Sequence, residues 1–163
     1  ATTQRWALVR SLSKTLGPDL RLAFVASDST TSAALRLRLN AGSQWVSHLL
    51  QGFAFACLND SVFTASLAES RRHYRRQNEK LAAALTQRGF PPFPPGDGLN
   101  FWLPLTEPSQ PIALRLARAG WLVREGEAFG IHTPSHGLRL SPGTLSDDEI
   151  ERLADDLHLV LHH

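Results

Sequence analysis

One lysine near the start of the chain stands among residues that suit imine chemistry. Lys14 lies between hydroxyl side chains in the run Ser11-Leu12-Ser13-Lys14-Thr15, directly after an apolar, strand-like stretch, and Arg21 follows it. A lysine amine can lose its proton and attack a carbonyl, whereas the guanidinium of arginine stays protonated. Short hydroxyls and an arginine fork can together hold phosphate oxygens. The pattern therefore suits a lysine that forms an imine while its neighbours hold a phosphate.

The composition draws further attention to Lys14. The 17 basic residues comprise 15 arginines and only two lysines, Lys14 and Lys80. A chain that otherwise avoids lysine has one at the position where imine chemistry requires it. A codon bias toward arginine explains the scarcity equally well, and an isolated lysine is most often a solvated surface amine.

The wider setting of this lysine resembles the Schiff-base segment of fold-type I pyridoxal-phosphate enzymes. The strand-like run before Lys14, the Gly17-Pro18 pair after it, and Arg21 with the apolar residues 22–25 match that family together. The run from Lys14 to Arg21 is most similar to the aminotransferase-like domain of MocR-type regulators in the GntR superfamily. The resemblance covers essentially the whole chain.

The resemblance implies roles for five residues. Lys14 would be the catalytic lysine that forms the imine with pyridoxal 5'-phosphate. Ser11 and Ser13 match positions whose hydroxyls contact the cofactor phosphate, and Arg21 matches the arginine that pairs with it. Arg139 matches the small-domain arginine that binds a substrate α-carboxylate. Read without the family, the serines are turn formers, Arg21 is a surface ion-pair partner and Arg139 faces outward from an alternating strand.

Two further details come from the same comparison with the family. Ala23 stands where the family usually has glycine after the Arg-Leu pair, which puts tight packing near the cofactor in doubt. The segment Gly126-Glu127-Ala128-Phe129 resembles the small-domain loop beside the carboxylate site, with Phe129 as a wall of the cleft.

The fold implied is α/β, namely the carboxy-terminal half of a fold-type I pyridoxal-phosphate-dependent transferase-like domain followed by a small α/β domain. We expect residues 1–88 to form the end of the large cofactor-binding domain, including a long connecting helix, and residues 89–163 to form the small domain. The proline- and glycine-rich run over residues 91–98 marks the boundary, because consecutive prolines forbid a helix.

Hydrophobic periodicity places the elements that must position these residues. Strands are predicted over 6–11, 20–27, 99–105, 121–125 and 137–141, and helices from the cap at 28–32 to about 39 and over 44–58, 62–88, 110–119 and the end of the chain. The last helix has clear start signals, since Ser146 and Glu149 form a capping box and Leu145 and Ile150 a hydrophobic staple. Four arginines within 71–76 are interpreted as a solvated face.

Composition excludes several classes of protein. A net charge of +2, with basic residues spread along the chain, does not indicate a DNA-reading surface. A single cysteine, Cys57, allows no internal disulfide and is predicted to be a buried thiol. His132 and His136 are separated by Pro134 and lack partner ligands, so no metal site is expected. No apolar segment approaches the length of a membrane span and no signal peptide is evident, so a cytoplasmic location is the default.

The chain has no methionine and starts only a few residues before a strand, so we expect it to be a fragment of a longer protein. The resemblance implies the effector-sensing domain of a transcriptional regulator, in the branch concerned with vitamin B6 metabolism. Its partners would be a second copy in a homodimer, DNA through an upstream winged-helix domain, and an amine or amino acid effector, with no membrane.

Two alternatives stay open at this point. A pyridoxal-phosphate-dependent aminotransferase acting on an amino acid and a 2-oxo acid would use the same residues. The isolated chain is expected to bind the cofactor poorly, because in the family the groups around the pyridine ring come from the preceding half of the domain. A folded fragment without retained activity is therefore the third reading.

Overall fold

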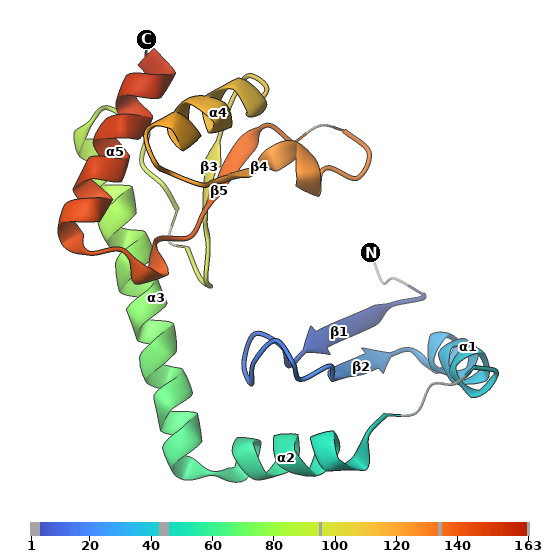
Figure 1. The fold of residues 1–163 in the computed structure, drawn as a ribbon. Helices are drawn as coiled ribbons and strands as arrows, with labels where there is room; N and C mark the ends of the chain where they lie inside the picture. Colours follow the sequence, from blue (N-terminus) through green and yellow to red (C-terminus); the bar gives the residue numbers. More distant parts are fainter. Residues whose placement is uncertain (1–3, 43–45, 95, 134, 163) are drawn as a thin grey trace. The chain divides into compact units, whose positions relative to one another are not determined.

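The computed structural model describes residues 4–42, 46–94, 96–133 and 135–162. The chain divides into two compact units, residues 1–68 and 69–163, and each is described by itself. The division falls inside the long helix α3 (Ser61–Gln87), which is labelled in Figure 1. A domain boundary at residues 88 and 89 stays a prediction. Among the described helices, none combines the length and apolar character that crossing a bilayer requires.

The first unit contains one β-hairpin and two helices (Figure 1). Strands β1 (Ala7–Ser11) and β2 (Ala23–Ser27) pair antiparallel, and α1 (Ser29–Asn40) and α2 (His48–Asn59) follow. The second strand is shorter than the predicted 20–27. The Leu12 amide still donates to the Leu22 carbonyl at 3.0 Å, but the Leu12 carbonyl accepts the amides of Thr15 and Leu16 instead of a strand partner. The predicted start of α2 at residue 44 lies outside the described residues.

Aspartates begin two of the helices near the hairpin. The Asp28 carboxylate accepts the backbone N–H of Thr31 at 3.0 Å, as the sequence predicts for the start of α1. Asp60 accepts the N–H of Phe63 at 2.6 Å at the start of α3. Such side chains satisfy amide groups that have no partner within the helix. The hydrogen bonds to Thr31 hold the pKa of the Asp28 carboxyl well below its usual range.

The first unit has a small core. Only Leu12, Leu20 and Ala54 form its buried cluster in the described part of the unit, and Leu16, Leu22 and Leu50 pack against them. Large apolar side chains of both strands are exposed, namely Leu8, Val9, Phe24 and Val25. Cys57 is half-buried, so the prediction of a buried thiol was wrong. The buried leucines therefore hold the connection between the two strands in place, whereas the faces of the strands themselves are largely not packed.

The second unit is a three-stranded antiparallel sheet with helices, in the order β3-β5-β4. Its elements after α3 are β3 (Phe101–Pro104), α4 (Gln110–Arg118), β4 (Arg124–Glu125), η1 (Gly126–Phe129), β5 (Gly137–Leu140), η2 (Pro142–Thr144) and α5 (Asp147–His162). The mixed α/β character agrees with the sequence-based prediction. Each strand is shorter than predicted, and β4 pairs over only two residues.

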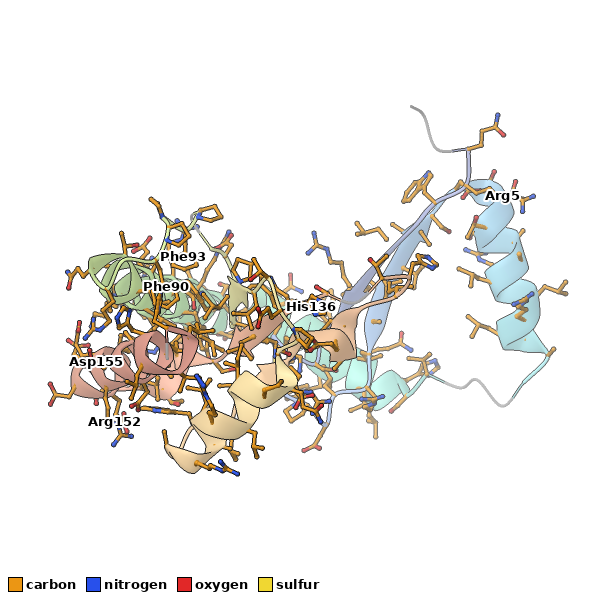
Figure 2. The ribbon with its side chains drawn as sticks, turned by 90° about the horizontal axis from the view of Figure 1, so that it is seen from above. Arg5, Phe90, Phe93, His136, Arg152 and Asp155 are labelled. Atoms are coloured by element: carbon orange, nitrogen blue, oxygen red, sulfur yellow. The ribbon has the colours of Figure 1, made fainter. Side chains whose placement is uncertain are left out.

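The core of the second unit draws side chains from every layer. Leu138 and Leu140 of β5 are 0% and 2% exposed, whereas Arg139 between them is only half-buried, as the two-residue period of a strand requires. Leucines from the other elements complete the core: Leu81 and Leu85 of α3, Leu103 of β3, Leu116 of α4 and Leu157 of α5. Phe90 and Phe93, labelled in Figure 2, pack on this core from the segment after α3.

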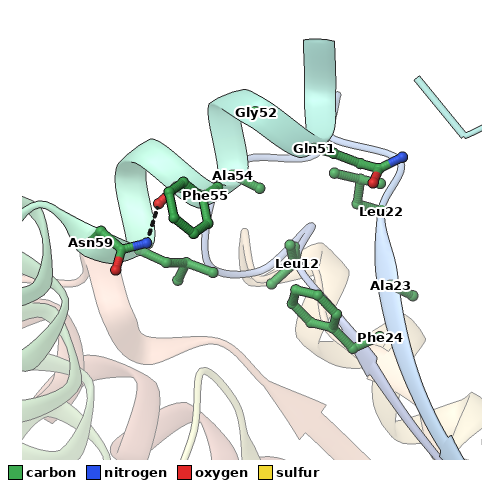
Figure 3. Close-up of a pocket in the computed structure, with 10 residues that line it drawn as sticks. Leu12, Leu22, Ala23, Phe24, Gln51, Gly52, Ala54, Phe55 and Asn59 are labelled. Carbon is green, nitrogen blue, oxygen red and sulfur yellow. Dashed lines mark hydrogen bonds between the residues drawn. The ribbon is translucent and has the colours of Figure 1, made fainter. Parts of the chain in front are cut away.

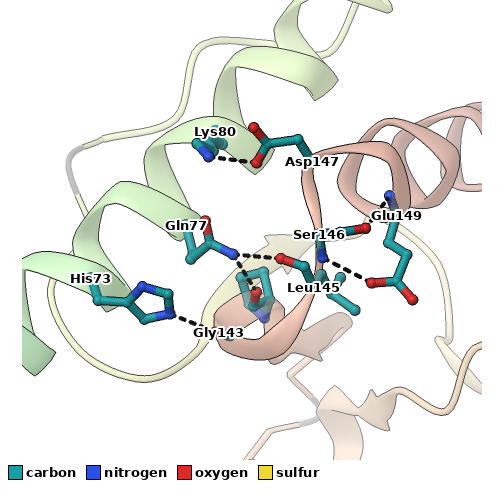
Figure 4. A network of polar contacts seen from close by, with 9 residues as sticks. His73, Gln77, Lys80, Gly143, Leu145, Ser146, Asp147 and Glu149 are labelled. Carbon is teal, nitrogen blue, oxygen red and sulfur yellow. Dashed lines mark hydrogen bonds and ion pairs between the residues drawn. The ribbon is translucent and has the colours of Figure 1, made fainter.

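Polar contacts bind the turn η2 to α3 (Figure 4). The Gln77 amide, which is nearly fully buried, donates to the carbonyls of Pro142 at 3.3 Å and Leu145 at 2.7 Å. His73 Nε2 lies 2.7 Å from the Gly143 carbonyl. Because η2 directly follows β5, these bonds fix the end of the strand that carries Arg139.

The four arginines on α3 are exposed, as predicted, and they are also ion-paired. Arg71 and Arg75 contact Asp97 at 2.6 and 3.1 Å. Arg72 and Arg76 contact Glu69 at 2.7 and 3.3 Å. These pairs are solvent-exposed and contribute little to stability. Each of these arginines has a carboxylate partner, but the four share only Asp97 and Glu69, so the group keeps a net positive charge.

The capping box at the start of α5 is confirmed. Glu149 accepts the backbone N–H of Ser146 at 2.8 Å, and the Ser146 hydroxyl accepts the N–H of Glu149 at 3.2 Å (Figure 4). Leu145 packs against the core cluster that contains Ile150, where the predicted staple lies. The hydrogen bond from the Ser146 amide holds the pKa of Glu149 below its usual range.

Replacing the capping serine tests this helix start. Ser146→Ala is expected to lower the free energy of unfolding by about 1 kcal/mol, because one amide of α5 loses its acceptor. Thr144→Ala is the control, since the Thr144 side chain is exposed and has no hydrogen bond to a described residue, and it should change stability by less than about 0.5 kcal/mol. Urea unfolding measures both variants, and equal losses would contradict the capping role.

Candidate functional site

The connection between β1 and β2 holds Lys14 in an exposed turn. The carbonyl of Leu12 accepts the amides of Thr15 at 3.0 Å and Leu16 at 2.8 Å, so the chain makes one tight turn around Lys14. Leu12 itself is buried against Leu20. The apolar anchor fixes the turn backbone while the lysine amine stays accessible.

The two serines predicted to hold a phosphate lie side by side in this connection. The Ser11 hydroxyl donates to the Ser13 hydroxyl at 3.1 Å, and the Ser13 amide donates to the Ser11 oxygen at 3.3 Å. The Ser13 hydroxyl donates in turn to the carbonyl of Leu20 at 3.2 Å. This chain of hydrogen bonds ties the end of β1 to the residue that precedes Arg21.

Both cations of the connection are unpaired. Within the described ranges, neither Lys14 nor Arg21 makes a side-chain hydrogen bond or an ion pair, and both are exposed. One segment thus presents an amine, two adjacent hydroxyls and a guanidinium. This donor set fits a phosphorylated aldehyde, because the amine can capture the aldehyde and the other groups can bind phosphate oxygens.

An apolar groove of about 470 Å³ lies in the same unit (Figure 3). Its lining includes Leu12, Leu22, Phe24, Ala54 and Phe55. Neither Lys14 nor Arg21 lines this groove, and no charged side chain of the described residues does so. The groove therefore lacks the charged groups that a phosphate requires, although it shares Leu12 with the lysine turn.

Arg139 lies in the second unit, on the face of β5 opposite the core. It stands across from Trp102 in the β3–β5 register. Its guanidinium carbon lies 5.1 Å from the ring centroid of Phe129, which is cation–π distance. The Nε atom of Arg139 is buried without a hydrogen-bond partner among the described residues. A buried, unpartnered donor is rare in folded proteins and is a reason to look for a ligand.

A recess of about 430 Å³ surrounds this arginine. It is lined by Asn100, Phe101, Trp102, Phe129, Ser135 and Arg139. Trp102 and Phe129 meet edge to face with their centroids 6.3 Å apart. Arg124 is the Cα partner of Arg139 across the β4–β5 pair and has no ion-pair partner in the described ranges. Aromatic walls with adjacent guanidinium groups favour an anion that carries an apolar part.

A second polar cluster of this unit was missed by the sequence-based reasoning. The Glu127 carboxylate accepts the Ser109 amide at 2.9 Å and the Ser109 hydroxyl, and it lies 2.8 Å from His136 Nδ1. Ser109 is fully buried and also accepts the Gly126 amide at 3.1 Å. The hydrogen bonds from Ser109, with a further one from His136, lower the pKa of Glu127 to about 2.

The cluster also shows the partner of His136, one of the two histidines considered as metal ligands from the sequence. His136, labelled in Figure 2, is bound to Glu127 and not to His132. Over the described residues, no three side chains of ligand type lie close enough to hold a metal. Pro134, which argued against a helix here, lies outside the described residues. The sequence contained no periodic signal for the cluster, because its three side chains come from separate segments.

Comparison with known proteins identifies relatives of this chain. A family model described as aminotransferase class I and II matches residues 1–157. The vitamin B6 salvage pathway transcriptional repressor PtsJ of Salmonella typhimurium is 61% identical over 161 residues, which is 99% of this chain. The chain spans 37% of the length of that repressor.

Solved structures share the fold at lower identity. The kynurenine aminotransferase of Pyrococcus horikoshii is 20% identical with a TM-score of 0.78, over 96% of this chain and 40% of its own. The α-aminoadipate aminotransferase LysN of Thermus thermophilus is 24% identical with a TM-score of 0.74, over 96% of this chain and 41% of its own. These matches establish the fold-type I α/β fold that the sequence predicted.

Titration of Glu127 provides a test of the polar cluster. The folded-state pKa of about 2 lies below the ordinary value of 4.5, so the carboxylate stabilises the fold above about pH 4.5 and loses this effect as the pH falls toward 2. Glu127→Gln is therefore expected to lower the urea midpoint at pH 7, with the difference from the native protein shrinking steadily toward about pH 2.5. Glu107→Gln, at an exposed carboxylate, is the control. A difference that stays constant with pH would contradict the role of the charge.

Proposed function

The chain belongs to the aminotransferase class I and II family, and from this membership we propose that it is part of the ligand-sensing, pyridoxal-phosphate-binding domain of a transcriptional regulator. The observation that carries this proposal is the 61% identity, over 99% of the chain, with a repressor of vitamin B6 salvage. Identity at that level spans both the lysine turn and the arginine recess. The regulated process proposed for the full-length protein is accordingly vitamin B6 metabolism.

In this proposal the lysine turn binds the cofactor. When bound, pyridoxal phosphate supplies an aldehyde that amines capture and a ring that withdraws electrons. Lys14 provides the attaching amine, and Ser11, Ser13 and Arg21 hold the phosphate. Support comes from the adjacent hydroxyls, 3.1 Å apart, and from the unpaired cations of the same connection. A related fold, LysN, was solved with N-(5'-phosphopyridoxyl)-L-leucine.

The recess around Arg139 binds the carboxylate of the effector or substrate in the same proposal. The buried Nε without a partner among the described residues supports this role, because a carboxylate would satisfy it. A guanidinium offers a planar fork that matches two carboxylate oxygens. The aromatic walls, Trp102 and Phe129, would contact the apolar part of the same molecule. An amino acid has both a carboxylate and an apolar part. It also has an amine that can take part in imine chemistry.

Regulation requires binding and does not require turnover. A ligand shifts a two-state protein only by its differential affinity for the two conformations, so catalysis is not needed. We propose that the full-length protein is a cytoplasmic homodimer that binds DNA through an upstream winged-helix domain. An amine or amino acid effector would then change the affinity for DNA.

An aminotransferase acting on an amino acid and a 2-oxo acid is the second candidate. The fold shared with the kynurenine and α-aminoadipate aminotransferases favours it. Both candidates use Lys14 and Arg139, so these residues do not separate them. DNA binding and turnover, measured on the same full-length protein, do separate them.

Reductive trapping tests the cofactor site. Borohydride treatment of the full-length protein with pyridoxal phosphate is expected to leave a pyridoxyl adduct at Lys14, mapped by peptide mass spectrometry. Lys14→Arg should abolish this adduct, because arginine cannot form the imine. Lys80→Arg is the matched control, since Lys80 is the other lysine of this chain and forms an ion pair with Asp147 at 2.5 Å. Labelling spread evenly over other amines would overturn the assignment.

Comparing DNA affinity with turnover tests the regulatory role. With pyridoxal phosphate bound, the full-length protein is expected to bind operator DNA with an affinity that changes at least about threefold when the effector is added. Formation of 2-oxo acid from amino acids should stay at background. Arg139→Gln should leave DNA affinity without effector unchanged and remove the response to a carboxylate-bearing effector. Steady transamination without DNA binding would favour the second candidate.

A further inference from the structure

The Glu127 carboxylate joins three segments of the second unit. It accepts hydrogen bonds from Ser109 at the start of α4 and contacts His136 just before β5. The helix dipole and the free amides at the start of α4 favour a negative charge at this place. The Ser109 hydroxyl is directed to Glu127 and does not cap its own helix. The start of α4 therefore has no capping bond from its own Ser109 side chain, and Glu127 of another segment accepts the Ser109 amide instead.

The turn that contains Glu127 has little freedom to move. A Cβ atom added to Gly126 would lie 2.7 Å from the carbonyl oxygen and 2.8 Å from the amide nitrogen of Gly137, so the two backbones are in close contact. The Gly126 amide donates to the buried hydroxyl of Ser109 at 3.1 Å. Close packing and the carboxylate contacts together hold η1 against the start of β5.

Phe129 ends the same turn and faces Arg139. Its ring lies 5.1 Å from the guanidinium carbon and meets Trp102 at 6.3 Å between centroids. Phe129 is 43% exposed, so packing alone leaves it room to move. The position of its ring therefore depends on the turn, and the turn is held at Glu127.

We propose that Glu127 is a positioning residue for Arg139: its carboxylate holds the turn that keeps Phe129 over the guanidinium and thereby sets the affinity for the carboxylate of the ligand. A free arginine side chain has many rotamers and loses conformational entropy when a ligand fixes one of them. A ring held over the guanidinium restricts the rotamers beforehand and so reduces this loss on binding. The inference rests on the proposed role of Arg139 in binding a carboxylate. It adds a dependence on Glu127, which does not line the recess.

Calorimetric titration of the full-length protein loaded with pyridoxal phosphate tests this inference. The probes are L-alanine and isopropylamine, which replaces the carboxylate of alanine by a methyl group. Glu127→Ala is expected to weaken L-alanine binding about fivefold and to leave isopropylamine binding unchanged. Glu127→Gln should recover part of the loss, because its amide oxygen still accepts the Ser109 N–H. Glu107→Gln is the control for loss of a carboxylate at an exposed site.

A double-mutant cycle separates positioning from general damage. In the Arg139→Gln background, Glu127→Ala should have no further effect on L-alanine, because it acts through the arginine. An equal effect in both backgrounds, or equal weakening for isopropylamine, would overturn the inference. Phe129→Leu leaves the contacts of the Glu127 carboxylate intact and keeps an apolar side chain in the wall of the recess, but it removes the ring over the guanidinium. It should therefore weaken L-alanine binding more than isopropylamine binding, as Glu127→Ala does, even if Glu127→Ala folds poorly.

The cycle also distinguishes this inference from the proposed function. If Arg139→Gln leaves L-alanine affinity unchanged, the carboxylate role of Arg139 fails, and the positioning role fails with it. If Arg139→Gln weakens L-alanine binding while Glu127→Ala and Phe129→Leu do not, the proposed function stands and the positioning role alone is wrong.

Discussion

The two-residue period of β5 is the constraint on which the arginine recess depends. Leu138 and Leu140 are buried in the core of the second unit, so Arg139 between them must face the other way. A slip of one residue would place a guanidinium in the core and two leucines in solvent, which is strongly unfavourable. Burial of two leucines therefore fixes the direction of the charged side chain without the help of any polar contact.

In the first unit, buried leucines also fix the position of the polar groups, but much less surface is buried. Leu12 and Leu20 bracket the connection that carries Lys14, and both are nearly fully buried. The faces of the hairpin stay exposed, and a two-stranded hairpin is only marginally stable in water. The lysine turn is thus the best-anchored part of a unit that otherwise has a small core. In both units, leucines next in sequence to the polar groups determine where those groups point.

Local patterns in the sequence predicted the parts of the fold that depend on nearby residues. The capping box at Ser146, the aspartate cap at Asp28 and the alternation around Arg139 each involve residues within four positions. Strand ends were less predictable, because the carbonyl of the apolar residue Leu12 is bonded to amides within the turn and not to the opposite strand.

The polar cluster at Glu127 could not be predicted from periodicity. Ser109 and His136 lie 18 and nine positions from it in the sequence, on either side. Nothing in the local pattern distinguishes Glu127 from an exposed glutamate in a loop. Only the folded backbone, with the start of α4 beside η1, brings a carboxylate to a buried hydroxyl. The sequence therefore suggested candidate ligand groups, whose roles stay predictions, but it could not predict the contacts of Glu127.

The contact between Gly126 and Gly137 restricts which sequences can encode this recess. A Cβ at Gly126 would meet the backbone of Gly137, and a Cβ at Gly137 would lie 2.8 Å from the Trp102 ring and 2.9 Å from the Leu103 carbonyl. Every other amino acid carries that atom, so no single substitution at either position is conservative. Variation at the recess must then come from its walls, such as Trp102 and Phe129, while the glycine pair beneath them stays unchanged. The walls of the recess can therefore differ among relatives of this chain without any change in the backbone that supports them.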